Sequence, residues 1–130
     1  MSVFTVELKN QPGELARLCE AMTATGVNLI LCATTHGDSG AVVFIADDEP
    51  SARTVLESAG IEYTMRPALT VRMENLPGAA AATFRTLGNA GINVDLLLPV
   101  RISDELFLAV ICTDDVDKAR NALGDQVAYE

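Results

Sequence analysis

Two short segments of the chain alternate apolar and polar residues with the period of a β-strand. The segments lie 65 residues apart, and polar residues such as Thr5 and Glu7 separate the apolar ones. The apolar members are Phe4, Val6 and Leu8 in the first segment and Leu69, Val71 and Met73 in the second. This period predicts a half-buried strand at both places.

A helix is predicted to follow each strand. The connections read Asn-Gln-Pro-Gly from Asn10 and Asn-Leu-Pro-Gly from Asn75, and a proline near the first helical position fixes the backbone without wasting an amide donor. Apolar residues then recur with helical spacing, with one polar exception in the second copy. These positions hold Leu15, Leu18, Cys19 and Met22 in the first copy and Ala80, Thr83, Phe84 and Leu87 in the second. Gly26 and Gly91 are expected to end the helices.

The rest of each copy predicts a hairpin, a second helix and a last strand. Strands over residues 28–34 and 41–46 flank a His-Gly-Asp-Ser-Gly turn, and residues 93–100 and 106–112 are their counterparts. Paired aspartates at 47–48 and 114–115 precede the second helices, where carboxylates suit exposed amides. Their expected role is therefore capping rather than catalysis. The last strands are expected over 61–65 and 126–129.

The chain as a whole is a tandem repeat. Eight of the 25 positions from Thr5 to Leu29 are identical to those from Thr70 to Val94. Both copies have the order strand, helix, strand, strand, helix, strand. We therefore expect an α+β fold of two ferredoxin-like βαββαβ units side by side, each an antiparallel sheet with helices on one face. Pro67 marks the boundary, which predicts units over residues 1–66 and 67–130.

Two of the predicted strands are apolar at successive positions. Residues 29–33 read Leu-Ile-Leu-Cys-Ala and residues 41–45 read Ala-Val-Val-Phe-Ile. Such runs predict burial on both faces of the sheet, whereas the helices cover only one. A homodimer that buries Val43, Ile45 or their neighbours on the helix-free face is the simplest arrangement that covers it.

Composition and charge narrow the classes of partner. The 130 residues are 49% hydrophobic, include no Trp and carry a formal net charge of -9, which does not suit nucleic-acid phosphates. The sequence opens with no signal-peptide pattern and has no apolar run near the roughly 18 residues of a membrane span, so we expect a cytoplasmic protein without a membrane partner. The three cysteines, Cys19, Cys32 and Cys112, lie in apolar stretches and are expected to be reduced core thiols.

Patterns typical of catalysis or cofactor binding are weak in this chain. The single histidine, His36, lies four residues after Cys32 in a turn with no further ligand nearby, which disfavours a metal site. The sequence also has no Gly-rich phosphate loop, and His36 has no evident nucleophile partner. We therefore expect no enzyme activity, no metal and no cofactor.

The segment Asn10-Gln-Pro-Gly-Glu-Leu15, closing with Gly26-Val-Asn28, resembles the ACT domain, a regulatory amino-acid-binding module of many biosynthetic enzymes. The second copy, with Asn75-Leu-Pro-Gly78 and Gly91-Ile-Asn-Val-Asp95, is similar to the paired ACT units of aspartate kinases. The resemblance covers nearly the whole chain, and no kinase, dehydrogenase or hydroxylase domain accompanies it. It implies a stand-alone tandem ACT protein that binds an amino acid or similar metabolite, with a regulated enzyme as a possible partner.

The resemblance also implies a ligand site between the helix-start loop and the adjacent strand, often at the junction of two ACT units. The first site would contain Asn10, Gln11, Gly13, Glu14 and Asn28, and the second Asn75, Leu76, Gly78, Ala79, Asn93 and Asp95. Amides at the helix start suit a ligand carboxylate. Only the second copy has an acid at the strand position, because Ile30 is the counterpart of Asp95, so we expect Asp95 to meet a ligand ammonium.

Two functions remain open from the sequence. The first is a non-enzymatic regulatory protein that binds an amino acid at the helix-start loops. The second is a structural protein–protein interaction module with no ligand, in which Asn10 and Asn75 only satisfy backbone groups of turns. The identity of the ligand is not specified by either pattern.

Overall fold

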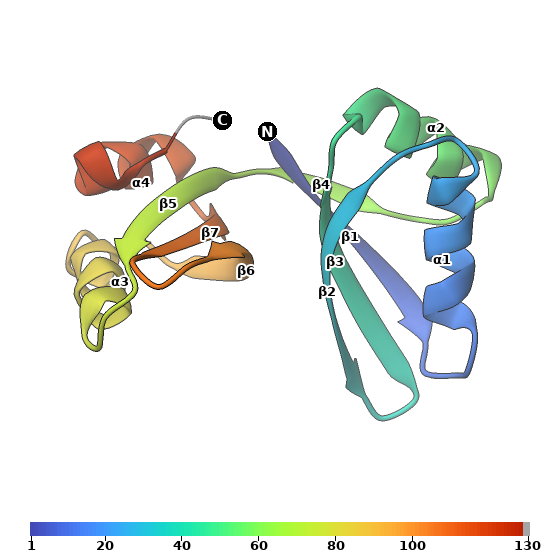
Figure 1. Cartoon of the computed structure of the whole chain (residues 1–130), viewed down its shortest axis with the longest axis horizontal. Coiled ribbons are helices and arrows are strands. Elements are labelled where there is room, and N and C mark those ends of the chain that lie inside the picture. Colours follow the sequence, from blue (N-terminus) through green and yellow to red (C-terminus); the bar gives the residue numbers. More distant parts are fainter. Residues whose placement is uncertain (129–130) are drawn as a thin grey trace. The chain divides into compact units, whose positions relative to one another are not determined.

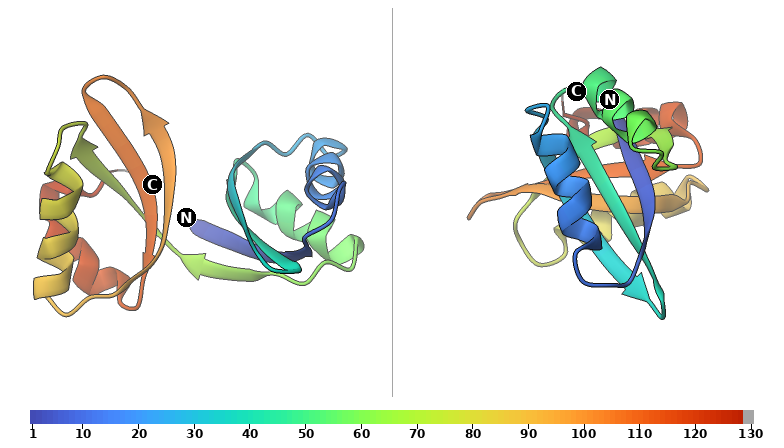
Figure 2. Two further views of the ribbon diagram at one scale, coloured as in Figure 1. Left: turned by 90° about the horizontal axis from the view of Figure 1, so that it is seen from below. Right: turned by 90° about the vertical axis from the view of Figure 1, so that its right-hand side faces the viewer.

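A computed structural model of the chain describes residues 1–128. The chain divides into two compact units. The first unit is Ser2–Arg66, and the second is Pro67 and the residues after it together with Met1. Each unit has one antiparallel sheet with helices packed on one of its faces (Figures 1 and 2).

The first unit contains a four-stranded sheet in the order β2-β3-β1-β4. Along the chain its elements are β1 (Ser2–Lys9), α1 (Glu14–Thr23), β2 (Leu29–His36), β3 (Ser39–Ala46), α2 (Glu49–Ser58) and β4 (Thr64–Pro67). Both β1 and β2 pair antiparallel with β3, so β2 and β4 form the edges of the sheet. The predicted order of elements is confirmed, although β4 begins at Thr64 and not at residue 61.

The second unit repeats this order with a three-stranded sheet, β5-β7-β6. Its elements are β5 (Leu69–Glu74), α3 (Ala79–Asn89), β6 (Val94–Ile102), β7 (Leu106–Thr113), α4 (Val116–Leu123) and the 3-10 helix η1 (Gly124–Gln126). The central strand, β7, pairs antiparallel with both neighbours. The expected fold of two repeated βαββαβ units is therefore present, except at the last strand of the second copy.

That last strand, expected over residues 126–129, is reduced to an isolated bridge between Val71 and Val127. Gln126 belongs to η1 instead, and its side-chain amide donates to the Thr83 hydroxyl at 2.8 Å and to the Arg72 carbonyl at 3.4 Å. The carboxamide thus occupies the edge of β5 where a strand residue would pair. Residue 129 of the expected strand lies outside the described residues.

Each unit has its own apolar core between the sheet and the helices. In the first unit, Phe4 and Phe44 face each other across β1 and β3, and their rings stack with centroids 5.0 Å apart. Leu18 of α1 and Leu56 of α2 complete this core. The second core has equivalent members: Leu69, Val71, Leu87, Ile111, Ala119 and Leu123. Burial of each large apolar side chain stabilises the fold by about 1.5–3 kcal/mol, and this burial holds the helices against the sheet.

The sequence predicted that β2 is buried on both faces of the sheet, but the strand has exposed residues. Ile30 is 40% exposed and Cys32 is exposed, whereas Val43 and Ile45 on β3 are half-buried. The reason is position, because β2 is an edge strand and the helices cover only one of its faces. The prediction of core thiols was accordingly wrong for Cys32, and among the cysteines only Cys112 is fully buried.

The second helices begin at aspartate caps, as the sequence predicts. The Asp48 carboxylate accepts hydrogen bonds from the Ser51 amide at 3.1 Å and the Ser51 hydroxyl at 2.6 Å. Asp115 accepts from the Lys118 amide at 3.0 Å. Each carboxylate satisfies an amide that the helix itself leaves open.

None of the helices over residues 1–128 is long and apolar enough to cross a membrane.

Our first prediction concerns two glycines of α3. Gly78 precedes the helix with a φ of 92°, so Gly78→Ala should cost about 1–2 kcal/mol of stability even though no atom lies within 4 Å of the added Cβ. Gly88 lies inside the same helix without a positive φ, and Gly88→Ala should gain about 0.5–1 kcal/mol. Urea denaturation measures both. Changes of the same sign would contradict the assigned conformations.

The second prediction concerns acid stability. Hydrogen bonds from Ser51 to the charged carboxylate lower the pKa of Asp48 below its usual value of 3.8. Because the folded pKa is the lower one, this contribution to stability is present above pH 3.8 and is lost as the pH falls through the folded pKa. The difference in Tm between the parent and Asp48→Asn should therefore shrink between pH 5 and pH 2. A difference that stays constant with pH would contradict it.

Candidate functional site

The two loop asparagines hold the helix-start loop against the neighbouring hairpin. The Asn10 backbone amide donates to the Asp38 carbonyl at 2.8 Å, and the Asn10 side-chain Nδ2 donates to the Gly37 carbonyl at 3.0 Å. Both bonds reach the turn between β2 and β3. A carboxamide that bridges two segments in this way fixes their distance, and its Oδ1 is still available as an acceptor on the exposed side.

Asn75 makes the same pair of bonds in the second unit. Its amide donates to the Glu105 carbonyl at 3.1 Å, and its Nδ2 donates to the Ser103 carbonyl at 2.7 Å. The turn between β6 and β7 is therefore tied to the loop before α3. Both asparagines thus have the structural role that the sequence left open as an alternative to ligand binding.

A left-handed glycine precedes the first helix of each unit. Gly13 has a φ of 87° and Gly78 a φ of 92°, and neither helix start has a side-chain cap. An added Cβ at either glycine would meet no atom within 4 Å. The first amide of each helix donates to its own loop, from Glu14 to the Gln11 carbonyl at 3.4 Å and from Ala79 to the Leu76 carbonyl at 3.2 Å. The next two amides of each helix are those that helix geometry leaves open, and such amides suit an anion.

The residue after each glycine differs between the units. In the first unit it is Glu14, whose Oε2 lies 2.9 Å from Nη2 of Arg17 one turn further along α1. In the second unit it is Ala79, which brings no charge to the helix start. A ligand carboxylate would meet a resident carboxylate at α1 and none at α3.

The strand-start asparagines are held by the first aspartate of each pair. The Asn28 amide donates to Asp47 Oδ1 at 2.9 Å, and the Asn93 amide donates to Asp114 Oδ1 at 3.1 Å. In both units this bond joins the start of an edge strand to the residue before the cap of the second helix. The two aspartates of each pair therefore have different roles: the first binds the start of the strand, and the second caps the helix.

Asp95 lies near the start of β6, where the strand departs from regular pairing. Val94 is opposite Thr113 and Leu96 is opposite Cys112, so the register shifts at Asp95. The Asn93 side chain donates to Asp95 Oδ1 at 2.6 Å. Irregular pairing of this kind re-aims a side chain, and here it presents a carboxylate on the exposed surface.

Within one unit, the two halves of each predicted site lie far apart. Asn10 contacts the turn that follows β2, whereas Asn28 immediately precedes β2. An extended strand of eight residues spans roughly 25 Å. Asn75 and Asp95 are separated in the same way by β6. A single unit therefore does not bring the loop and the strand-start residues to one small ligand.

The remaining two predicted residues, Gln11 and Leu76, occupy the same place in the two loops. Both are exposed, and the Gln11 amide donates to the Lys9 carbonyl while the Leu76 carbonyl accepts from the Ala79 amide. Their side chains, one polar and one apolar, lie beside the open helix start.

A family model described as an ACT domain pair matches residues 1–128. The chain belongs to the ACT domain pair family. No curated protein matches it by sequence. The expected family and its paired organisation are thereby confirmed.

Solved structures share the fold of this ACT pair at low sequence identity. A protein from Bacteroides thetaiotaomicron is 22% identical with a TM-score of 0.86, over 97% of this chain and 88% of that one. The ligand-free regulatory subunit of aspartate kinase from Thermus thermophilus is 19% identical with a TM-score of 0.70, over 96% and 90%. The aspartate kinase of Clostridium acetobutylicum is 16% identical with a TM-score of 0.62, over 95% and 33%.

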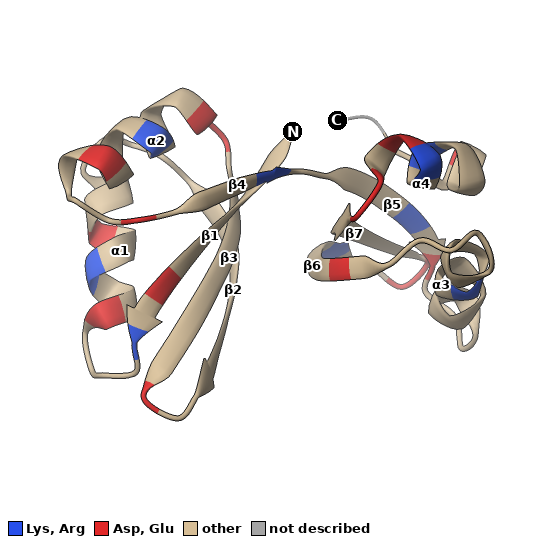
Figure 3. Cartoon of the chain, turned by 180° about the vertical axis from the view of Figure 1, so that it is seen from behind, with Lys and Arg blue, Asp and Glu red and all other residues tan. Residues whose placement is uncertain are grey.

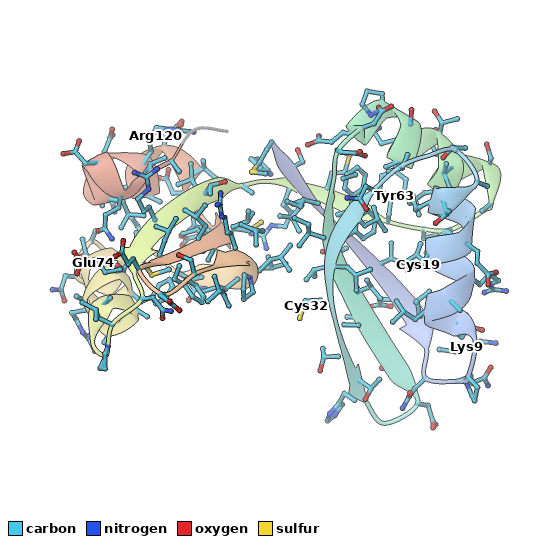
Figure 4. The ribbon with its side chains drawn as sticks, viewed as in Figure 1. Lys9, Cys19, Cys32, Tyr63, Glu74 and Arg120 are labelled. Atoms are coloured by element: carbon cyan, nitrogen blue, oxygen red, sulfur yellow. The ribbon has the colours of Figure 1, made fainter. Side chains whose placement is uncertain are left out.

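Sequence reasoning missed a groove of about 960 Å³ in the first ACT unit. It is lined by residues from the end of β1, the first turn of α1 and the connection from α2 to β4, and two of the lining residues, Lys9 and Tyr63, are labelled in Figure 4. The groove lies where the eight residues of β1 extend beyond the four of β4, a difference in length that no local sequence pattern reveals. Beside it, the hydrogen bond that the Arg53 guanidinium donates to the Tyr63 oxygen, together with electrostatic attraction to Tyr63 and Glu57, raises the pKa of Arg53.

Charged side chains are scattered over both ACT units rather than gathered at either loop (Figure 3). Over residues 1–128, no three His, Cys, Asp or Glu side chains are grouped so that they could hold a metal ion.

Proposed function

We propose that this ACT pair is a non-enzymatic regulatory protein that binds a free amino acid or a similar metabolite at its helix-start loops. The observation that carries the proposal is the uncapped start of α1 and of α3, each behind a left-handed glycine and open to solvent. Membership of the ACT domain pair family and the fold shared with regulatory subunits of aspartate kinase support it.

The ligand's two charged groups have separate partners in this proposal. The carboxylate takes the amides of the second and third helical residues, where the partial positive charge of the helix start favours it. The ammonium takes a side-chain oxygen, either the Oδ1 of the loop asparagine or the carboxylate of Asp95. The site residues are then those expected from the sequence, divided between a loop half and a strand-start half.

A second copy of the chain can bring the two halves together. Antiparallel strands place the start of one strand against the end of the other. If β2 of one copy pairs with β2 of a second copy, Asn28 of one comes beside the turn that Asn10 of the other holds. The first-unit site is then complete at the junction of two ACT units, and the protein is a homodimer.

The two edge strands differ in how well they suit such pairing. β2 pairs with β3 in one continuous register from Leu29 to His36 and contains no proline. β6 shifts register twice and contains Pro99, which has no amide to donate. We therefore assign the homodimer contact to β2, in place of the helix-free face that the apolar sequence runs favoured.

The alternative function is a protein–protein interaction module without a ligand. The bonds of Asn10 and Asn75 to the hairpin turns favour it, because those bonds alone account for both residues. It differs from the first proposal in predicting no response to amino acids.

The third prediction is that an amino acid stabilises the protein. A ligand at 100 times its Kd adds about 2.7 kcal/mol to the free energy of unfolding, which raises the Tm of a chain of this size by several degrees. A thermal-shift screen against the proteinogenic amino acids measures this. If none shifts the Tm, the interaction module is favoured.

Asp95→Ala refines the same experiment. Loss of a charge-assisted hydrogen bond costs about 1.5–3 kcal/mol, so affinity should fall roughly tenfold to a hundredfold by calorimetry if Asp95 holds the ammonium. Asp117→Ala, which removes an exposed acid in the first turn of α4, is the matched surface control and should leave the affinity unchanged. Equal affinity for the parent and Asp95→Ala would remove Asp95 from the site.

The fourth prediction tests the β2 contact through Cys32. Placing Asn28 beside residues 36–38 of the other copy puts Cys32 opposite residues 32–34, so the two Cys32 Cα atoms lie within roughly 8 Å. Because Cys32 is exposed, a short bis-maleimide should link the two chains. Cys32→Ser should abolish the link, while Cys19→Ser should not. An unlinked dimer would place the contact elsewhere.

A further inference from the structure

The most exposed large apolar side chains of the described chain lie together at one end of the second unit. Leu76 is 62% exposed and Ile102 is 63% exposed. Leu76 follows Asn75, and Ile102 precedes Ser103, whose carbonyl accepts the Asn75 side chain at 2.7 Å. The two residues are therefore each one position from the same hydrogen bond, beside the open start of α3.

The sheet register shows which way Ile102 faces. It lies opposite Phe107, and Phe107 packs against the core beneath the helices. Directly opposed residues of an antiparallel pair point to the same face. Ile102 is thus on the helix side of the edge strand, as is Leu97, which lies opposite Ile111 and is also exposed.

The first unit has polar residues at the equivalent places. Gln11 takes the place of Leu76 in the loop, and Thr35, opposite Gly40 on β3, takes the place of Ile102. The exposed apolar residue at this end of the first unit is Leu15, on α1 itself and 40% exposed. The two units therefore share the asparagine, the glycine and the uncapped helix start, whereas these two neighbouring positions are polar in the first unit and apolar in the second.

We infer that the second-unit loop takes an amino acid with an apolar side chain, and that the Leu76–Ile102 pair sets this preference. The inference rests on the proposed function, which supplies the partners of the carboxylate and the ammonium. Those partners are common to all amino acids, so selectivity comes from the groups that meet the side chain. The side chains of Leu76 and Ile102 are exposed to water beside this site. An aliphatic ligand side chain that covers them removes apolar surface from water, which favours binding.

The test is a calorimetric series of L-alanine, L-norvaline and L-norleucine on the full chain. Each added methylene buried between Leu76 and Ile102 should raise the affinity about fourfold. The double variant Leu76→Gln/Ile102→Thr gives the second unit the residues of the first. It should lower the affinity for norleucine at least tenfold and leave the affinity for alanine little changed. The affinity should then no longer rise from alanine to norleucine. Leu15→Gln, an exposed apolar-to-polar change in the first unit, is the control and should leave the series intact.

The outcomes separate this inference from the proposed function. If amino acids bind but affinity does not rise along the series, the inferred preference for apolar side chains is wrong. The same holds if the double variant leaves the norleucine affinity unchanged. In both cases the proposed amino-acid site is still supported. If no amino acid binds at all, both fall together. If the double variant changes self-association by sedimentation while norleucine affinity per site stays the same, the pair is a contact between proteins and not part of a ligand site.

Discussion

The length of an edge strand is the constraint on which this account depends. β2 separates Asn10 from Asn28 by eight extended residues, and an extended backbone cannot shorten to bring its ends together. Each end is fixed by its own bonds. Asn10 bonds to the hairpin turn at one end, and Asn28 bonds at the other end to Asp47, the residue before the cap of α2. A ligand the size of an amino acid cannot span this distance. Any site that uses both ends must therefore take them from different units, and the regular edge of β2 offers the way to do so.

Much of the fold could be predicted from the sequence because its signals are local. The alternation around Val6 and Val71, the positions of Gly13 and Gly78 and the paired aspartates each specify a strand, a turn or a cap without reference to the rest of the chain. Because the sequence is a repeat, each of these patterns occurs twice and supports the same element in both units.

The features that the sequence did not reveal depend on position in the sheet. Nothing in the residues around Cys32 indicates that their strand is an edge, so their exposure was not foreseen. At the expected last strand of the second copy, Gln126 belongs to η1, and its side chain donates to the Arg72 carbonyl. The candidate site was predicted residue by residue through a family resemblance, which names the residues and not their separation within one unit.

The two copies have diverged around a common frame. Asn10 and Asn75 make equivalent bonds, and Asp48 and Asp115 cap equivalent helices. The differences gather at the loops, where Glu14 is replaced by Ala79 and Gln11 by Leu76. If both loops bind a ligand as proposed, these differences give the two units different ligand preferences.

Sedimentation equilibrium with and without amino acid tests the central claim most directly. If one site takes residues from two copies, ligand binding and dimerisation are linked, and each must strengthen the other by the same factor. The amino acid that raises the Tm most should therefore lower the Kd of the dimer at least tenfold when it is saturating. A 13.8 kDa monomer that binds the amino acid with unchanged affinity at every protein concentration would contradict the account.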